Sequence, residues 1–264
     1  MTVRSRGWRW VRRVVAATSA LVLVATCALL LWLLNPSDVR EQALAAVNDD
    51  AAVALSYHDG YVSLAPANGA VREAVVFYPG GHAAARAYVP RWAPIVAATG
   101  TMVLIPDVPL GLAFLDSDAV DPIMADWPQV DRWWLGGHSL GGVAATDHLA
   151  AHPELDVEGL VLWAAFPDRD ADLAGLDLDV LAVTGSRDEI VATQEVRASL
   201  DRLPPGTRTV EIDGMEHSQF GAYDSFFGDG DPAISDERAQ SLLASETADF
   251  LADQGSRRTA SVER

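Results

Sequence analysis

The sequence predicts an α/β protein in which helices cover both faces of a mostly parallel sheet. Short apolar runs typical of buried strands alternate with helical patterns between residues 52 and 252. Glycine-rich or polar stretches follow several of these runs, at the places where an open α/β sheet carries its ligand-binding loops. A longer apolar run near the N-terminus has the length of a membrane span. We therefore expect one transmembrane helix followed by one α/β domain.

The apolar run at 14–34 contains 21 consecutive uncharged residues. A helix of that length spans about 30 Å, the thickness of a bilayer core. Five arginines and no acid lie within residues 1–13. The positive-inside rule therefore predicts a basic cytoplasmic N-terminus and a body outside the cell membrane. The alternative is a cleaved signal peptide and a secreted protein, but the bulky residues that end the run favour an uncleaved anchor.

The remaining elements follow from local patterns. Residues 35–50 are predicted to form a short helical linker, the α/β domain to occupy 51–252, and the polar residues 253–264 to form a flexible tail. A hairpin is predicted at 52–57 and 61–65, around a turn at 58–60. Further strands are expected at 74–78, 102–105, 132–135, 160–165, 180–184 and 207–212, with helices at 84–98, 118–125, 140–151, 190–200 and 236–252.

Charge and composition exclude several classes of function. Once residues 1–13 are set aside, 14 basic residues remain against 37 acidic ones, a net charge of −23. A body this acidic repels nucleic acid, so we exclude nucleic-acid binding. Cys27 is the only cysteine and cannot form an internal disulfide. No cluster of Cys and His has zinc-site spacing, so we expect no metal, and the motifs described below imply no organic cofactor. The sequence does not indicate an oligomeric state.

The strongest chemical motif is Gly137-His138-Ser139-Leu140-Gly141. It follows the strand at 132–135 and precedes the helix at 140–151, which is the context that a nucleophile elbow requires. In such an elbow the serine sits on a sharp turn, and glycines two residues before and after it relieve the crowding. A serine hydroxyl is a weak nucleophile at neutral pH and needs a base. Ser139 is therefore the candidate nucleophile.

An acid and a histidine lie in two later loops that also follow strands. Asp188 comes after the strand at 180–184, and His217 after the strand at 207–212. Each alone is weak evidence, since such residues are commonly turn or helix-cap residues or solvated loop residues. Together with Ser139 they meet at one edge of the sheet. We predict a catalytic triad in which His217 is the base and Asp188 orients it.

A fourth motif, at 78–82, follows the strand at 74–78. Acyl transfer needs two backbone N–H groups that stabilise the oxyanion formed in the reaction. We expect one from Leu140 and the other from either Gly81 or His82. The alternative is an ordinary glycine turn.

These segments resemble the α/β-hydrolase superfamily, and more narrowly a bacterial branch of small, capless serine hydrolases of the esterase or lipase type. The segments are FYPGGHAAARAY at 77–88, LGGHSLGG at 135–142, VTGSRDEIV at 183–191, EHSQFGAY at 216–223 and GDGDPAIS at 228–235. The resemblance implies Ser139, Asp188 and His217 as the triad, in the chain order that this fold uses. It also implies an oxyanion hole of Leu140 with Gly81 or His82. The sequence departs from the branch at 224–227.

The resulting hypothesis is an anchored hydrolase of small-molecule esters that works through an acyl-enzyme. An acyltransferase with the same triad and a non-catalytic anchored binding protein are the alternatives. Only 48 residues separate Ser139 from Asp188, and two strands must fit there, so we expect no large cap domain. The apolar loop at 106–116 is expected either to line an acyl pocket or to pack into the core.

Overall fold

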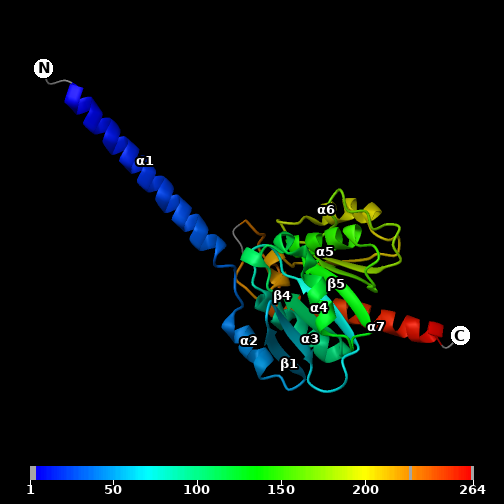
Figure 1. The fold of residues 1–264 in the computed structure, drawn as a ribbon. Helices are drawn as coiled ribbons and strands as arrows, with labels where there is room; N and C mark the ends of the chain where they lie inside the picture. Colours follow the sequence, from blue (N-terminus) through cyan, green and yellow to red (C-terminus); the bar gives the residue numbers. More distant parts are fainter. Residues whose placement is uncertain (1–3, 226–227, 263–264) are drawn as a thin grey trace. The chain divides into compact units, whose positions relative to one another are not determined.

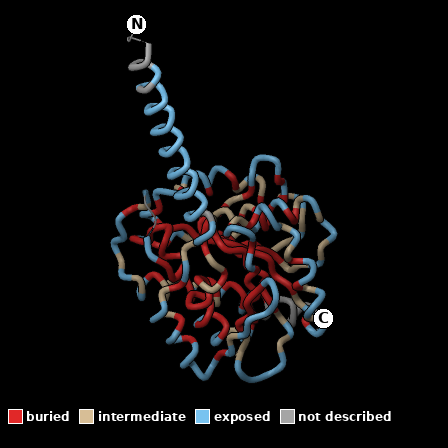
Figure 2. The backbone as a smooth tube through the Cα atoms, turned by 60° about the vertical axis from the view of Figure 1, so that its left-hand side comes forward, coloured by how far each residue is buried: buried red, intermediate tan, exposed pale blue. Residues whose placement is uncertain are grey.

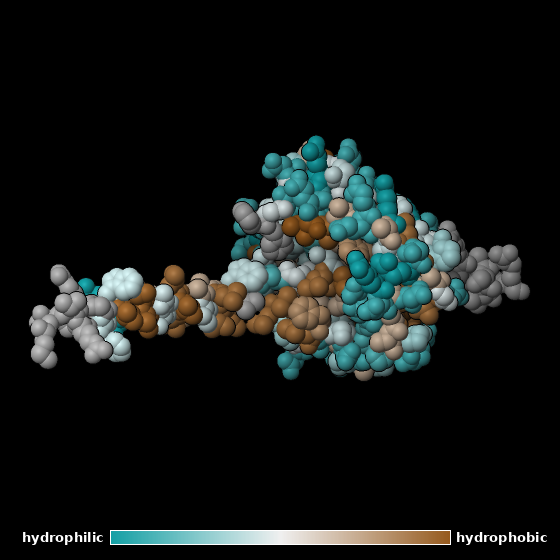
Figure 3. Space-filling model, turned by 90° about the horizontal axis from the view of Figure 1, so that it is seen from above, coloured by the Kyte–Doolittle hydropathy of each residue, from teal (hydrophilic) through white to brown (hydrophobic). Residues whose placement is uncertain are grey.

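The computed structural model describes residues 4–225 and 228–262 and divides the chain into two compact units, 1–36 and 37–264 (Figure 1). The first unit contains one helix, α1 (Arg4–Leu33). Its stretch Trp10–Trp32 is, within the described residues, the one helical segment long and apolar enough to cross a membrane. Its described side chains are exposed and predominantly hydrophobic, whereas the visible face of the body is mostly hydrophilic (Figure 3).

The second unit is built on an eight-stranded sheet with the order β1-β2-β4-β3-β5-β6-β7-β8. Strand β2 pairs antiparallel with β1 and β4, and every other neighbouring pair is parallel. The strands are β1 (Val53–His58), β2 (Tyr61–Pro66), β3 (Glu73–Tyr78), β4 (Met102–Pro106), β5 (Arg132–His138), β6 (Gly159–Trp163), β7 (Asp179–Gly185) and β8 (Arg208–Ile212).

Helices cover both faces of this sheet, as the sequence predicts. Figure 1 shows α5 and α6 on one side of the strands and α3 and α7 on the other. The connections β3–β4 and β5–β6 run in opposite directions, so right-handed crossovers place α3 and α5 on opposite faces. The helices of the body are α2 (Glu41–Asn48), α3 (Val89–Thr99), α4 (Val120–Asp126), α5 (Leu140–Ala151), α6 (Thr193–Ala198) and α7 (Asp236–Val262). Short 3-10 segments lie at Ala85–Tyr88, Pro109–Gly111, Ala113–Leu115, Ser117–Ala119, Leu200–Arg202 and His217–Phe220.

The core lies along the central strands. Strands β3 to β7 are buried almost throughout because helices pack on both of their faces (Figure 2). Aromatic rings fill the space beneath α3, where Trp92 stacks on Trp163 with ring centroids 5.1 Å apart. Phe77 of β3 packs against both rings. The connection between β6 and β7 contains no helix or strand, so the expected absence of a large cap domain is confirmed.

The segment 35–50 differs from the predicted linker. The compact body begins at Ser37, and α2 packs against α3. Val39, Leu44 and Val47 are buried in the hydrophobic core. The alternation of apolar residues with alanines and acids, which we interpreted as a linker, is the amphipathic pattern of a helix docked on the domain.

Three helix predictions also differ from the structure. The predicted helix 84–98 begins as a 3-10 turn, and the α-helix starts only at Val89. The predicted helix 190–200 is shortened to α6, because the Asp188 carboxylate accepts the N–H groups of Ile190 and Val191 and holds them in a turn. Helix α7 continues to Val262 through most of the segment predicted as a flexible tail.

A glycine in β6 provides a test of the sheet. A Cβ on Gly159 would lie 1.8 Å from the carbonyl oxygen of Asp179 in the paired strand β7. We expect Gly159→Ala to cost about 3 kcal/mol of unfolding free energy, because the strands must separate locally. That cost lowers Tm by about 6–12 °C in a protein of this size. Thermal unfolding measured by circular dichroism checks it. Gly175→Ala is the matched control, since its Cβ would meet no atom within 4 Å. Equal melting of the two variants would contradict the described pairing.

Candidate active site

Strands β3 and β5 are neighbours, and the chain leaves them toward opposite edges of the sheet. This is the topological switch point at which open α/β sheets bind ligands, beyond the carboxyl ends of the strands. Tyr78, the last residue of β3, pairs with Gly137 of β5. The glycine loop that begins at Pro79 and the turn that carries Ser139 therefore leave the sheet side by side.

Ser139 occupies a strained turn between β5 and α5. Its φ of 50° and ψ of −124° lie in a region that residues other than glycine rarely adopt, and such strain concentrates at functional sites. Its N–H donates to the Trp163 carbonyl at 2.9 Å, which fixes the turn to β6. A Cβ on Gly137 would lie 2.3 Å from the Gly141 carbonyl carbon, and one on Gly141 2.3 Å from the Pro79 oxygen. The neighbouring backbone lies so close at both positions that a side chain would not fit, which explains both glycines.

Asp188 and His217 form a buried pair. Nδ1 of His217 lies 2.8 Å from Oδ2 of Asp188. The other carboxylate oxygen accepts the N–H groups of Ile190 at 2.9 Å and Val191 at 2.7 Å. A carboxylate accepts hydrogen bonds, so in this pair the ring nitrogen Nδ1 is the donor and carries the proton. Nε2 of His217 is then the nitrogen that can accept a proton.

Asp229 holds the backbone of the histidine loop, and the sequence analysis did not single it out. Its carboxylate accepts the N–H of His217 at 3.1 Å and the N–H and hydroxyl of Ser218, each at 2.7 Å. These bonds satisfy the first N–H groups of the 3-10 turn His217–Phe220. The segment at 228–235 carried family resemblance, and the acidic side chain within it was the available signal. The departure noted at 224–227 lies partly outside the described residues, which omit 226 and 227.

His138 connects Ser139 to the other loops. Its ring centroid lies 4.5 Å from that of His217, which places the candidate base against the residue preceding Ser139. Burial, together with the nearby His217, lowers the pKa of His138 well below its ordinary value and keeps the ring neutral. Its Nδ1 lies 2.8 Å from the Tyr88 hydroxyl, which accepts the Gly80 N–H at 2.8 Å. The Tyr88 hydroxyl therefore joins His138 to the glycine loop.

The two alternatives for the second oxyanion donor differ in their hydrogen bonding. The N–H of His82 donates to the Gly111 carbonyl at 2.7 Å, so it is already engaged. Gly81 makes no such bond within the described residues, and a Cβ there would lie 3.4 Å from the Leu140 side chain. The Leu140 N–H is in the first turn of α5, where helical N–H groups lack intrahelical partners. This geometry favours Gly81 with Leu140 over His82.

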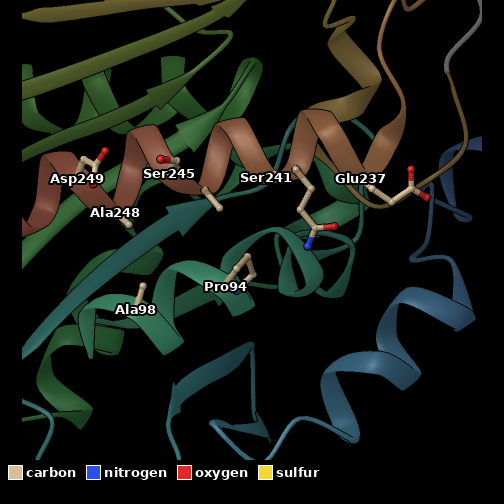
Figure 4. A pocket seen from close by; sticks show the side chains of 9 residues that line it. Pro94, Ala98, Glu237, Ser241, Ser245, Ala248 and Asp249 are labelled. Carbon is tan, nitrogen blue, oxygen red and sulfur yellow. The ribbon is translucent and has the colours of Figure 1, made fainter.

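Other cavities and clusters lie apart from these loops. A surface groove of about 520 Å³ runs between α3 and α7, and none of its lining residues belongs to the loops that carry Ser139, Asp188 or His217 (Figure 4). Within the described residues one group could hold a metal ion: Asp118, His148 and His152, with ligand atoms within 4.8 Å of one another. The sequence contains this His-x₃-His spacing, with His148 in α5 and His152 just beyond its last residue, and we predicted no site from it. His148 lies nine residues beyond Ser139, or about 13 Å along the helix, so the cluster is separate from the candidate triad.

The family model described as "Alpha/beta hydrolase family" matches residues 74–241. The chain belongs to this family. Solved structures agree on the fold of this α/β hydrolase. An esterase from Pyrobaculum calidifontis matches with a TM-score of 0.58 and 17% identity over 80% of this chain and 90% of that one. Esterase 2 of Thermogutta terrifontis matches with a TM-score of 0.57 and 16% identity over 77% and 95%.

A structure described as a CIB-like hydrolase from Thermoplasma acidophilum matches this α/β hydrolase with a TM-score of 0.57 and 16% identity, over 76% of this chain and 99% of that one. At these sequence identities the similarity shows a shared fold and nothing more. Among curated proteins no sequence matches.

Glu216, beside the candidate base, provides a pH test. Burial, reinforced by the Asp229 carboxylate, raises the pKa of Glu216 from 4.5 to about 7. Between these values the unfolded chain has lost the proton that the folded chain keeps, so stability falls as pH rises from about 4.5 to about 7. Glu216→Gln has no titrating carboxyl at this position and should lack this pH dependence. We therefore expect the Tm of the variant minus the Tm of wild type to increase from about pH 4.5 to about pH 7 and then to stay constant. Melting curves at several pH values check it. A constant Tm difference from pH 4 to 8 would contradict it.

Proposed function

We propose that this α/β hydrolase is a membrane-anchored serine hydrolase that cleaves carboxylic esters through a Ser139–His217–Asp188 triad. The observation that carries the proposal is the buried 2.8 Å contact of His217 with Asp188, with the His217 ring packed against the residue preceding Ser139. Such a pair is what turns a serine at a strained elbow into a nucleophile.

The proposed mechanism follows from these contacts. His217 Nε2 takes the Ser139 proton as Oγ attacks the ester carbonyl, and Asp188 stabilises the imidazolium. The N–H groups of Gly81 and Leu140 bind the oxyanion, each donor contributing about 10²–10³ in kcat in related systems. The alcohol leaves with a proton from His217. Water then attacks the acyl-enzyme, with His217 again as the base.

Two further observations support hydrolysis of esters. The structural neighbours include proteins described as esterases, among them Thermogutta terrifontis esterase 2 phosphorylated by paraoxon. The connection between β6 and β7 contains no helix or strand that would roof the site, so water can reach an acyl-enzyme.

The anchor is the second part of the proposal. The stretch Trp10–Trp32 of α1 has the length and composition of a span, and tryptophans at its two ends suit the membrane interface. The five arginines before and at the N-terminal end of this stretch favour a cytoplasmic N-terminus, with the catalytic body on the outer side. Release after signal cleavage is the competing outcome. Intact masses of the protein recovered from the membrane fraction and from the medium separate the two.

Labelling with a fluorophosphonate probe tests the nucleophile. We expect the detergent-solubilised chain to be labelled, Ser139→Ala to show no labelling, and His217→Ala to label at least about 100-fold more slowly, because the hydroxyl then lacks its base. Ser245→Ala is the matched control, an exposed serine on α7 that lines the groove in Figure 4. Absence of labelling in the folded wild type would refute the serine mechanism.

Replacing the acid tests the role of the pair. We expect Asp188→Asn to lower kcat by about 10³-fold or more, because an amide donates a proton toward Nδ1 and favours the wrong tautomer. Steady-state kinetics on a soluble p-nitrophenyl ester measure it. Asp229→Asn is the comparison, since Asp229 holds backbone N–H groups rather than the ring. A smaller loss of kcat in Asp188→Asn than in Asp229→Asn would contradict the assignment.

A further inference from the structure

The first residues of the body are bonded directly to the oxyanion loop. The Ser37 N–H donates to the His82 carbonyl at 2.8 Å, and the Ser37 carbonyl accepts the Ala84 N–H at 2.9 Å. Together these bonds form a parallel bridge between Ser37 and Ala83. Asp38 continues the contact through an ion pair with Arg86. The chain therefore enters the body next to Gly81, the candidate oxyanion donor.

The same segment is also fixed to the loop of the candidate base. The Arg40 N–H donates to the Ala222 carbonyl at 2.7 Å, just after the 3-10 turn that begins at His217. The Arg40 side chain pairs with Asp236, which also binds the buried Arg91. Residues 37–40 thus hold both active-site loops, and their position relative to the site is set by bonds within the body.

The chain between α1 and this segment is short. Residues 34–36 alone separate Leu33, the last residue of α1, from Ser37. Four Cα–Cα steps reach at most about 14 Å. A folded body of residues 37–264 has a radius of gyration of about 17 Å and is therefore about 45 Å across. Ser37, which is bonded to the oxyanion loop, is thus tethered to the end of α1 by a chain much shorter than the width of the body.

Most of the exposed large apolar side chains of the body lie at the edge of the sheet that carries the active-site loops. Five large hydrophobic residues of the described body are exposed, and four of them follow the carboxyl ends of parallel strands: Leu110, Phe114 and Leu115 after β4, and Ile190 after β7. The loop after β4 contacts the oxyanion loop through the bond from His82 to Gly111. Phe114 and Leu115 are 57% and 50% exposed, so they neither fill the core nor line a closed pocket. Exposed apolar groups beside a site mark an interaction surface.

We propose that the active site works at the outer surface of the bilayer that holds α1, and that the substrate is an ester lipid of that leaflet. This inference rests on the proposed function, because it names the substrate class of the same site. The tether limits how far the site can lie from the bilayer, and Leu110, Phe114 and Leu115 supply apolar contact with the interfacial region, where lipid ester carbonyls lie. The net charge of the body disfavours anionic headgroups, so a neutral or zwitterionic lipid fits best.

A rigid spacer tests the inference. Four EAAAK repeats inserted after Leu34 would extend α1 by about 30 Å and lift the site away from the bilayer. The full chain is reconstituted in phosphatidylcholine vesicles with either 4-methylumbelliferyl oleate, which dissolves in the bilayer, or the water-soluble acetate, which has the same leaving group. We expect the spacer to lower the oleate-to-acetate rate ratio about tenfold or more, because the site no longer reaches the leaflet. The same twenty residues appended after Arg264 are the control and should leave the ratio unchanged.

A second pair of variants tests the apolar edge. Phe114→Ser with Leu115→Ser should lower the oleate-to-acetate ratio about threefold or more, because bilayer contact scales with the apolar area offered to it. Val71→Ser is the control, since Val71 is partly exposed in the loop that precedes β3, at the amino ends of the parallel strands. It should leave the ratio unchanged.

The outcomes separate this inference from the proposed function. If the wild type hydrolyses the acetate but the spacer variant keeps the full ratio, the membrane-facing site is overturned and the esterase stands. Acetate cleavage without oleate cleavage also overturns the inference alone. Recovery of the protein only as a chain lacking residues 1–36 overturns both the inference and the proposed anchor, and leaves the esterase standing. If neither ester is cleaved by folded wild type, the proposed function fails.

Discussion

The parallel pairing of β3 with β5 is the constraint on which the rest of the site depends. It brings the glycine loop after β3 against the turn after β5, so closely that a Cβ on Gly141 would lie 2.3 Å from the Pro79 oxygen. No other residue type could keep both backbones in place at that position. The strained backbone of Ser139 is tolerated because its N–H bond to β6 and the packing of α5 against β5 hold the turn in place. The positions of the candidate nucleophile and of the candidate oxyanion donors thus both follow from the pairing of β3 with β5.

The side chains around the candidate base are held in place by buried hydrogen bonds as well as by packing. Asp188 accepts three hydrogens, and Asp229 fixes the loop backbone from the other side. His138, kept neutral by burial, lies between this loop and Tyr88 of the glycine-loop side. A change in any one of these loops therefore affects the others through the His138 ring, which is why single substitutions here should alter both stability and rate.

Much of this arrangement could be predicted from the sequence, because it depends on the periodicity of apolar residues and on the glycine and polar residues that end each run. The strands, the helix over 140–151 and the elbow glycines follow from apolar runs and local sterics. The role of residues 37–50 could not be predicted, since only the tertiary fold shows that Val39 and Leu44 have a core to enter. The choice between Gly81 and His82 depended on the Gly111 carbonyl, which is 29 residues away in sequence from His82. The bonds of Asp229 to the histidine loop and the approach of Asp118 to His148 likewise become visible only when distant segments meet.

The central claim is that Ser139 becomes acylated during turnover. The most direct measurement is mass spectrometry of the chain quenched in acid while it hydrolyses a p-nitrophenyl ester, followed by digestion. The account predicts one added acyl group on the peptide that contains Ser139, which accumulates in wild type and is absent from Ser139→Ala. Turnover of the ester with no acyl group on that peptide, or with the group on another residue, would contradict it.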